Sequence, residues 1–114
     1  MSIEECYKKF GGDYQDVMQR LPSESLIERF LKKFLDDKSY QNIVTNLESD
    51  ELDEAFRAAH TLKGLCQNLG LDRLYQSSRD VTEALRDGKN DVTESMLKSL
   101  QDDYELTVSA IREL

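Results

Sequence analysis

The apolar residues of this chain recur every three or four positions along almost its whole length, which is the period of an α-helix. No stretch shows the sustained alternation of a β-strand, and no hairpin turn lies between β-rich runs. Five glycines and a single proline leave few interruptions in 114 residues. The sequence therefore predicts an all-α protein.

Glycines, the proline and capping residues divide the chain into helices. Two short helices are predicted first, over 2–10 and 13–20, and the later helices are predicted over 23–35, 39–47, 50–68, 71–87 and 91–111. Ser23, Asp50 and the spacing Asp91-x-x-Glu94 are expected to cap three of them at the N-terminal end, while Gly70 and Gly88 end helices. Four helices of roughly 14–22 residues with short connections predict an antiparallel up-down four-helix bundle, with the extra short N-terminal helices across one end.

Length and charge narrow the classes of function. A chain of 114 residues is expected to form a single domain, 1–114. The net charge of −8 argues against nucleic acid and against an anionic membrane as partner. The N-terminus lacks the basic and apolar regions of a signal peptide, and no apolar run approaches the length of a membrane span. We therefore expect a cytoplasmic monomer.

Helical apolar stripes also predict which side chains form the core. The predicted helix 23–35 carries Leu26, Ile27, Phe30, Phe34 and Leu35 on its inward face. The two cysteines are far apart in sequence and form no C-x-x-C pair, and Cys66 falls on an apolar face, where it is expected to act as a small hydrophobic residue.

The only histidine lies in the most informative stretch. On a helix His60, Lys63, Gly64 and Gln67 stand at i, i+3, i+4 and i+7, so they share one face beside the apolar stripe. An accessible imidazole beside a cation suits a nucleophile that takes up an anionic group. His60 is far from both helix ends, so Lys63 must supply most of the positive charge, with Arg57 at i−3 as a second candidate.

Gly64 is unusual because glycine inside a helix costs roughly 0.5–1 kcal/mol relative to alanine. Helical side chains lean toward the N-terminus, so a side chain at position 64 would cover the turn that carries His60. Glycine leaves that imidazole uncovered. The alternative is that Gly64 lets two helices pack closely.

The string AHTLKGLCQNLG, residues 59–70, closely resembles the signature of HPt domains, the phosphotransfer modules of multistep His-Asp phosphorelays. In that signature a histidine is followed by x-Leu-Lys-Gly and, after four more residues, by Leu-Gly. The signature positions are all filled here, by His60, Leu62, Lys63, Gly64, Leu69 and Gly70.

The resemblance implies that His60 Nε2 attacks the aspartyl phosphate of a receiver domain and later passes the phosphoryl group to another receiver. Lys63 would contact the phosphate, and Gly64 would give the receiver clearance. Family members often place a glutamine on the next helix against the other ring nitrogen, and here that position holds Thr82, whose shorter side chain would accept the Nδ1 proton through its hydroxyl. Arg79 and Arg86 flank Thr82, and each either contacts the phosphate or, as we favour, stays solvated. The implied partners are receiver domains of response regulators or hybrid histidine kinases. The protein would need no cofactor of its own, because Mg²⁺ is expected on the receiver.

Two other functions stay open at the level of sequence. One is a phosphoacceptor module that takes its phosphate directly from a histidine kinase, although the chain itself lacks a Gly-rich nucleotide loop and is not expected to be an enzyme. The other is a helical adaptor without phosphotransfer. A metal enzyme fits least, because one histidine, two distant cysteines and adjacent carboxylate pairs give no ligand set with helical spacing.

Overall fold

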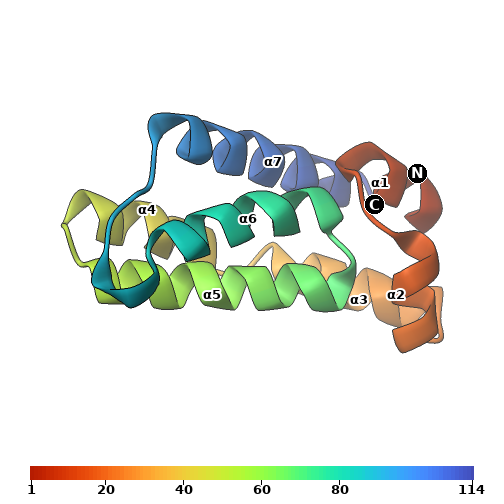
Figure 1. The fold of residues 1–114 in the computed structure, drawn as a ribbon. Helices are drawn as coiled ribbons and strands as arrows, with labels where there is room; N and C mark the ends of the chain where they lie inside the picture. Colours follow the sequence, from red (N-terminus) through yellow and green to blue (C-terminus); the bar gives the residue numbers. More distant parts are fainter.

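The computed structural model describes all residues, 1–114, and confirms that the protein is all-α (Figure 1). It contains seven α-helices, one 3-10 helix and no strand. The elements are α1 (Ile3–Phe10), α2 (Tyr14–Arg20), α3 (Glu24–Phe34), α4 (Ser39–Glu48), α5 (Leu52–Leu69), α6 (Asp72–Ala84), η1 (Arg86–Gly88) and α7 (Glu94–Arg112).

The predicted antiparallel bundle is confirmed. Helices α5, α6 and α7 run up and down in alternating directions, and α3 leads into α4 along the opposite direction to α5 (Figure 1). Helix α5 packs against α4 on one side and α6 on the other, and α6 packs against α7. The first member of the bundle is thus split into two short helices, α3 and α4, while α5 and α7 are long and unbroken.

The two extra N-terminal helices pack across one end of the bundle, as predicted (Figure 1). Their apolar side chains Tyr7, Phe10 and Val17 are fully buried and belong to the same core cluster as residues of α5, α6 and α7. The Tyr7 hydroxyl donates a hydrogen bond of 2.7 Å to the carbonyl oxygen of Leu69, at the end of α5. Helix α1 is therefore attached directly to the C-terminal end of α5, the helix that carries the signature histidine.

Local sequence explains where α3 and α5 begin or end. The Ser23 side chain accepts a hydrogen bond from the Leu26 backbone N–H, at 3.1 Å, and so caps α3. Gly70 ends α5 in a left-handed conformation, with φ at 66°, and the N–H of Leu71 donates to the Cys66 carbonyl oxygen. Both positions confirm the sequence prediction.

Two predicted caps were wrong. Asp50 is not the N-cap of α5, because it lies one residue further out in a turn with φ at 56°, and Glu51 takes the N-cap position without a side-chain hydrogen bond. Asp91 does not cap α7 either, because that helix starts at Glu94 and Thr93 accepts from the Met96 N–H. In both cases several neighbouring polar residues compete for one cap, and the tertiary path of the chain selects among them.

Two further predictions need correction. The helix expected over 71–87 ends at Ala84, and Asp87, with φ at 61°, separates it from the connection to α7. Phe30 was expected in the core but is 38% exposed, because Leu31, which was not among the predicted core residues, takes the fully buried position on α3. None of the helices combines the length and the apolar character that a membrane span requires.

Candidate functional site

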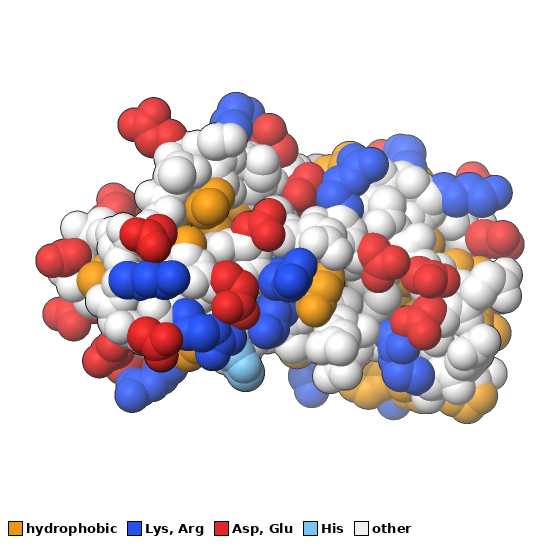
Figure 2. Space-filling model, viewed as in Figure 1, with side chains coloured by type: hydrophobic (Ala, Val, Ile, Leu, Met, Phe, Trp, Pro, Cys, Tyr) orange, Lys and Arg blue, Asp and Glu red, His pale blue; other side chains and the backbone are white.

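His60 is exposed to solvent near the middle of α5, as predicted. On the adjacent face of the same helix Ala59, Leu62 and Cys66 are fully buried and anchor α5 in the core. In Figure 2 the imidazole projects from the edge of the molecule next to a group of Lys and Arg side chains. The helix therefore presents this ring to solvent while its buried stripe packs in the core.

The structure decides between the two explanations for Gly64. A Cβ built on Gly64 would meet no heavy atom within 4 Å. The alternative that this glycine lets two helices pack closely is therefore wrong. What its missing side chain leaves is open space on the His60 face of α5.

Phe56 is the nearest aromatic neighbour of the histidine and was not among the predicted site residues. Its ring centroid lies 6.0 Å from that of His60, with an angle of 33° between the ring planes. The guanidinium carbon of Arg86 lies 5.3 Å from the same Phe56 centroid, a cation–π contact. The i, i+4 spacing of Phe56 and His60 was the available signal. Phe56 also stands at i−3 from Ala59 on the apolar stripe of the same helix, and that spacing predicts a core residue instead.

Glu83 on α6 is hydrogen-bonded to Arg86 of η1, the same arginine that lies over Phe56. Arg86 donates two hydrogen bonds to the Glu83 carboxylate, Nε to Oε2 and Nη2 to Oε1, both at 2.9 Å. These hydrogen bonds are the main cause that lowers the pKa of Glu83, and the positive charges of Arg86, Lys63 and Arg79 lower it further. One carboxylate thus lies within the field of three cations, one of them on α5.

A model of the Hpt domain family matches residues 25–110, which is most of the chain. The chain belongs to the Hpt domain family. Residues 3–20, which form α1 and α2, precede the matched segment. Hpt domains carry a phosphoryl group on a histidine within phosphorelays, so the family match agrees with the histidine signature.

One curated relative is the chemotaxis protein CheA of Borreliella burgdorferi, which is 46% identical to this Hpt domain over 59 residues. The alignment covers 46% of this chain and 7% of CheA, so the Hpt domain corresponds to a small part of that relative. No solved structure matches the chain.

Within this Hpt domain Lys63 and Arg79 make no ion pair with any carboxylate, whereas Arg57 is paired with Glu54. Arg57 is therefore already engaged one turn before His60. Gln67 is exposed, and the contact it makes is through its backbone, whose carbonyl oxygen accepts a hydrogen bond of 2.9 Å from Arg20.

Thr82 is fully buried, and its hydroxyl donates a hydrogen bond of 2.7 Å to the Ser78 carbonyl oxygen. No hydrogen bond joins Thr82 to His60. The role predicted for Thr82, as acceptor of the Nδ1 proton, has no contact in this structure to support it.

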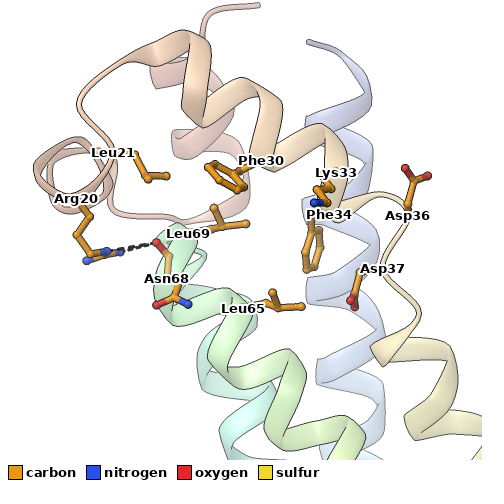
Figure 3. A pocket seen from close by; sticks show the side chains of 10 residues that line it. All are labelled: Arg20, Leu21, Phe30, Lys33, Phe34, Asp36, Asp37, Leu65, Asn68 and Leu69. Atoms are coloured by element: carbon orange, nitrogen blue, oxygen red, sulfur yellow. Dashed lines mark hydrogen bonds between the residues drawn. The ribbon is translucent and has the colours of Figure 1, made fainter.

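An open groove of about 590 Å³ lies next to the C-terminal half of α5 (Figure 3). It lies between α2, α3, the α3–α4 connection and α5, and Phe30, Leu21 and Leu65 supply its apolar surface. None of the predicted site residues lines it. The candidate site is thus an exposed surface centred on His60, outside this groove. No group of three or more metal-ligating side chains accompanies it.

Proposed function

We propose that this Hpt domain relays a phosphoryl group between aspartates of receiver domains through a phosphohistidine at His60. The observation that carries the proposal is the combination, on one helical face, of an exposed imidazole with open space above Gly64. A receiver must bring its aspartyl phosphate into line with the ring nitrogen, and an exposed, uncovered histidine permits that approach.

The chemical step is a displacement at phosphorus. The lone pair of the unprotonated Nε2 of His60 forms the N–P bond as the bond between phosphorus and the aspartate oxygen breaks. The electron pair of the broken bond returns to the carboxylate of the receiver, and Nδ1 keeps its proton. Reversal of the same step delivers the phosphoryl group to the next receiver.

Lys63 and Arg79 are the cations proposed to stabilise the charge on the transferring group. Neither is committed to an ion pair in the unphosphorylated protein, and Lys63 follows His60 by three residues on the same helix. Charge-assisted hydrogen bonds to phosphate oxygens are stronger than neutral ones, so an available ammonium group beside the ring favours the phosphorylated state. Arg57, which is held by Glu54, is given no part in the step.

The proposed partners are receiver domains of response regulators or hybrid histidine kinases. We assign the Mg²⁺ of the reaction to the receiver, whose carboxylates would hold it next to the aspartyl phosphate. The chain then acts as a phosphocarrier, and the aspartate side of the reaction supplies the catalytic metal.

Incubation with an isotopically phosphorylated receiver tests the proposal. His60 should acquire label as a phosphoramidate, which is labile in acid and stable in base. His60→Gln should acquire none while keeping the helical circular dichroism of wild type. Label that survives mild acid, or that persists in His60→Gln, would contradict the assignment, and a protein that no receiver labels would be an adaptor.

A second candidate is the phosphoacceptor module of a histidine kinase, which receives the phosphoryl group from a kinase domain with bound ATP. The similarity to a short segment of the much longer CheA favours it, because an Hpt domain there forms part of a longer protein. Labelling from ATP in the presence of a kinase domain, at a rate above that from any phosphorylated receiver, would identify this role.

A further inference from the structure

The carboxylate of Glu83 occupies the position of a counter-ion at the histidine site. It accepts both hydrogen bonds of the Arg86 fork at 2.9 Å, and Arg86 in turn lies over Phe56, whose ring neighbours that of His60. The four side chains form a continuous series from α6 through η1 to the centre of α5. The cation closest to the aromatic neighbour of His60 is therefore neutralised in the unphosphorylated protein.

A phosphoryl group on His60 would change the balance of charge at this place. It adds close to two negative charges and three strong acceptor oxygens on the His60 side of Phe56. Arg86 then has two possible partners, the carboxylate of Glu83 and the phosphoryl oxygens. The fork of a guanidinium fits a phosphate as well as a carboxylate, so the two anions compete for the same donors.

Direct repulsion acts in the same direction. The Glu83 carboxylate interacts electrostatically with Lys63 and Arg79 as well as with Arg86. A phosphoryl group on His60 would draw on the same three cations. Two anions that draw on one set of cations raise each other's free energy. Each effect makes the phosphohistidine less stable than it would be beside a neutral side chain.

We propose that Glu83 is a positioning residue that holds Arg86 in the unphosphorylated protein and, by competing with the phosphoryl group for it, keeps phosphohistidine at His60 a ready donor. The inference rests on the proposed function of His60. A carrier must give up its phosphoryl group as easily as it accepts it, and Glu83 shifts the equilibrium toward release.

The test is the substitution Glu83→Gln, which keeps the shape of the side chain and removes its charge. With a phosphorylated receiver, the equilibrium ratio of phospho-His60 to phosphorylated receiver should rise about three- to tenfold, since one repulsive charge is removed and Arg86 is freed for the phosphate. Phosphorus NMR should show a lowered pKa of the phosphoryl group, because its dianion gains a cation. An unchanged ratio and an unchanged phosphoryl pKa would overturn the inference.

A matched control is Asp102→Asn on α7, which also breaks an exposed two-contact ion pair, at 2.7 and 2.9 Å from Lys98. It should leave the ratio as in wild type. If the Glu83–Arg86 ion pair only stabilises its helix, Glu83→Gln should also leave this ratio unchanged. The same ratio in both variants would therefore assign Glu83 a structural role.

The variant Arg86→Gln identifies the route of the effect. If Glu83 acts through Arg86, the substitution Glu83→Gln should change the ratio much less in the Arg86→Gln background than in wild type. Equal effects in both backgrounds would contradict the role of Arg86.

Phosphoramidate, a small phosphodonor, separates this inference from the proposed function because it labels an accessible histidine without a receiver. A wild-type protein that neither phosphoramidate nor any receiver labels would refute the function of His60 itself. A labelled wild type, with a Glu83→Gln variant whose equilibrium ratio and phosphoryl pKa are both unchanged, would refute only the role of Glu83.

Discussion

Gly64 makes α5 less stable, and no packing contact in the structure compensates for this loss. A glycine inside a helix is less favourable than alanine by about 0.5–1 kcal/mol, and no atom lies close enough to a Cβ at this position to make the glycine necessary for packing. Packing within the folded chain therefore does not explain why position 64 holds a glycine. Access of a receiver domain to His60, as proposed above, accounts for this glycine.

Substitution of Gly64 separates stability from transfer. Gly64→Ala should raise the free energy of unfolding by about 0.5–1 kcal/mol, and Gly64→Gln should fold but accept phosphate much more slowly, because its side chain leans over His60. Chemical denaturation and transfer rates from a phosphorylated receiver measure the two effects.

Gly88 provides the control for that experiment. A Cβ there would also meet nothing within 4 Å, but φ is +77°. Gly88→Ala should therefore destabilise the protein by roughly 1 kcal/mol and leave transfer unchanged. A Gly64→Gln protein that accepts phosphate at the wild-type rate would contradict the clearance that we assign to Gly64.

Lys63 is the other residue of the signature with a testable role. Lys63→Ala removes a cation that is free of ion pairs, and the transition state for transfer should lose about 1–3 kcal/mol of stabilisation. The free energy of unfolding should change by less than about 0.5 kcal/mol, as at most surface positions. Single-turnover transfer rates measure the loss, with Lys8→Ala on α1 as a control that should transfer normally.

At the scale of elements, the end of α5 is held by the two N-terminal helices. Arg20 of α2 donates to the carbonyl oxygens of Gln67 and Asn68, and Tyr7 of α1 donates to that of Leu69. The last carbonyl groups of a helix have no partner within the helix, so these side chains satisfy them. The short helices thus stabilise the histidine-bearing helix from outside the segment that matches the family model.

Tyr7→Phe tests that attachment. The buried hydroxyl is lost, and the Leu69 carbonyl oxygen loses its donor, so the free energy of unfolding should fall by about 1–3 kcal/mol. Tyr75→Phe, which removes a hydroxyl without a hydrogen bond inside the chain, is the control and should cost much less. Equal losses in the two variants, measured by urea denaturation, would show that the bond to Leu69 contributes nothing.

At the scale of the whole molecule, the hydrophobic core contains two thiols and a phenol that become negatively charged when they lose a proton. Burial is the main cause that raises the pKa of the Cys6 thiol to about 11, and burial also raises the pKa values of Cys66 and Tyr7. A group whose pKa is higher in the folded state stabilises the fold below its unfolded pKa. That contribution is lost as the pH rises toward the folded value.

The protein should therefore lose stability between about pH 9 and pH 11, with Cys6 alone contributing about 2 kcal/mol to the loss. Thermal unfolding measured across this range tests the expectation. Cys6→Ala should be less stable than wild type at pH 7 but should show a smaller decrease as the pH rises. A wild-type melting temperature that stays constant up to pH 11 would contradict the burial of these groups.

The sequence by itself determined what depends on neighbours along the chain. Helical period places His60, Lys63 and Gly64 on one face whatever packs around them, because residues three and four apart on a helix are always adjacent. Gly70 ends its helix for an equally local reason, since glycine adopts a left-handed backbone without a steric penalty. The all-α bundle and the exposed position of His60 could be predicted because both depend on this helical periodicity.

Only the tertiary structure decided what lies against that face. Arg86 meets Phe56 because α6 returns along α5 and ends in a tight turn at η1. The two residues are far apart in the sequence, so helical spacing could not predict this contact. Thr82 is buried and Phe30 is exposed because the relative rotation of packed helices selects which flank of an apolar stripe is covered. Whether Gly64 opens onto solvent or onto another helix depended on that same packing, and this was the question on which the function of the site depended.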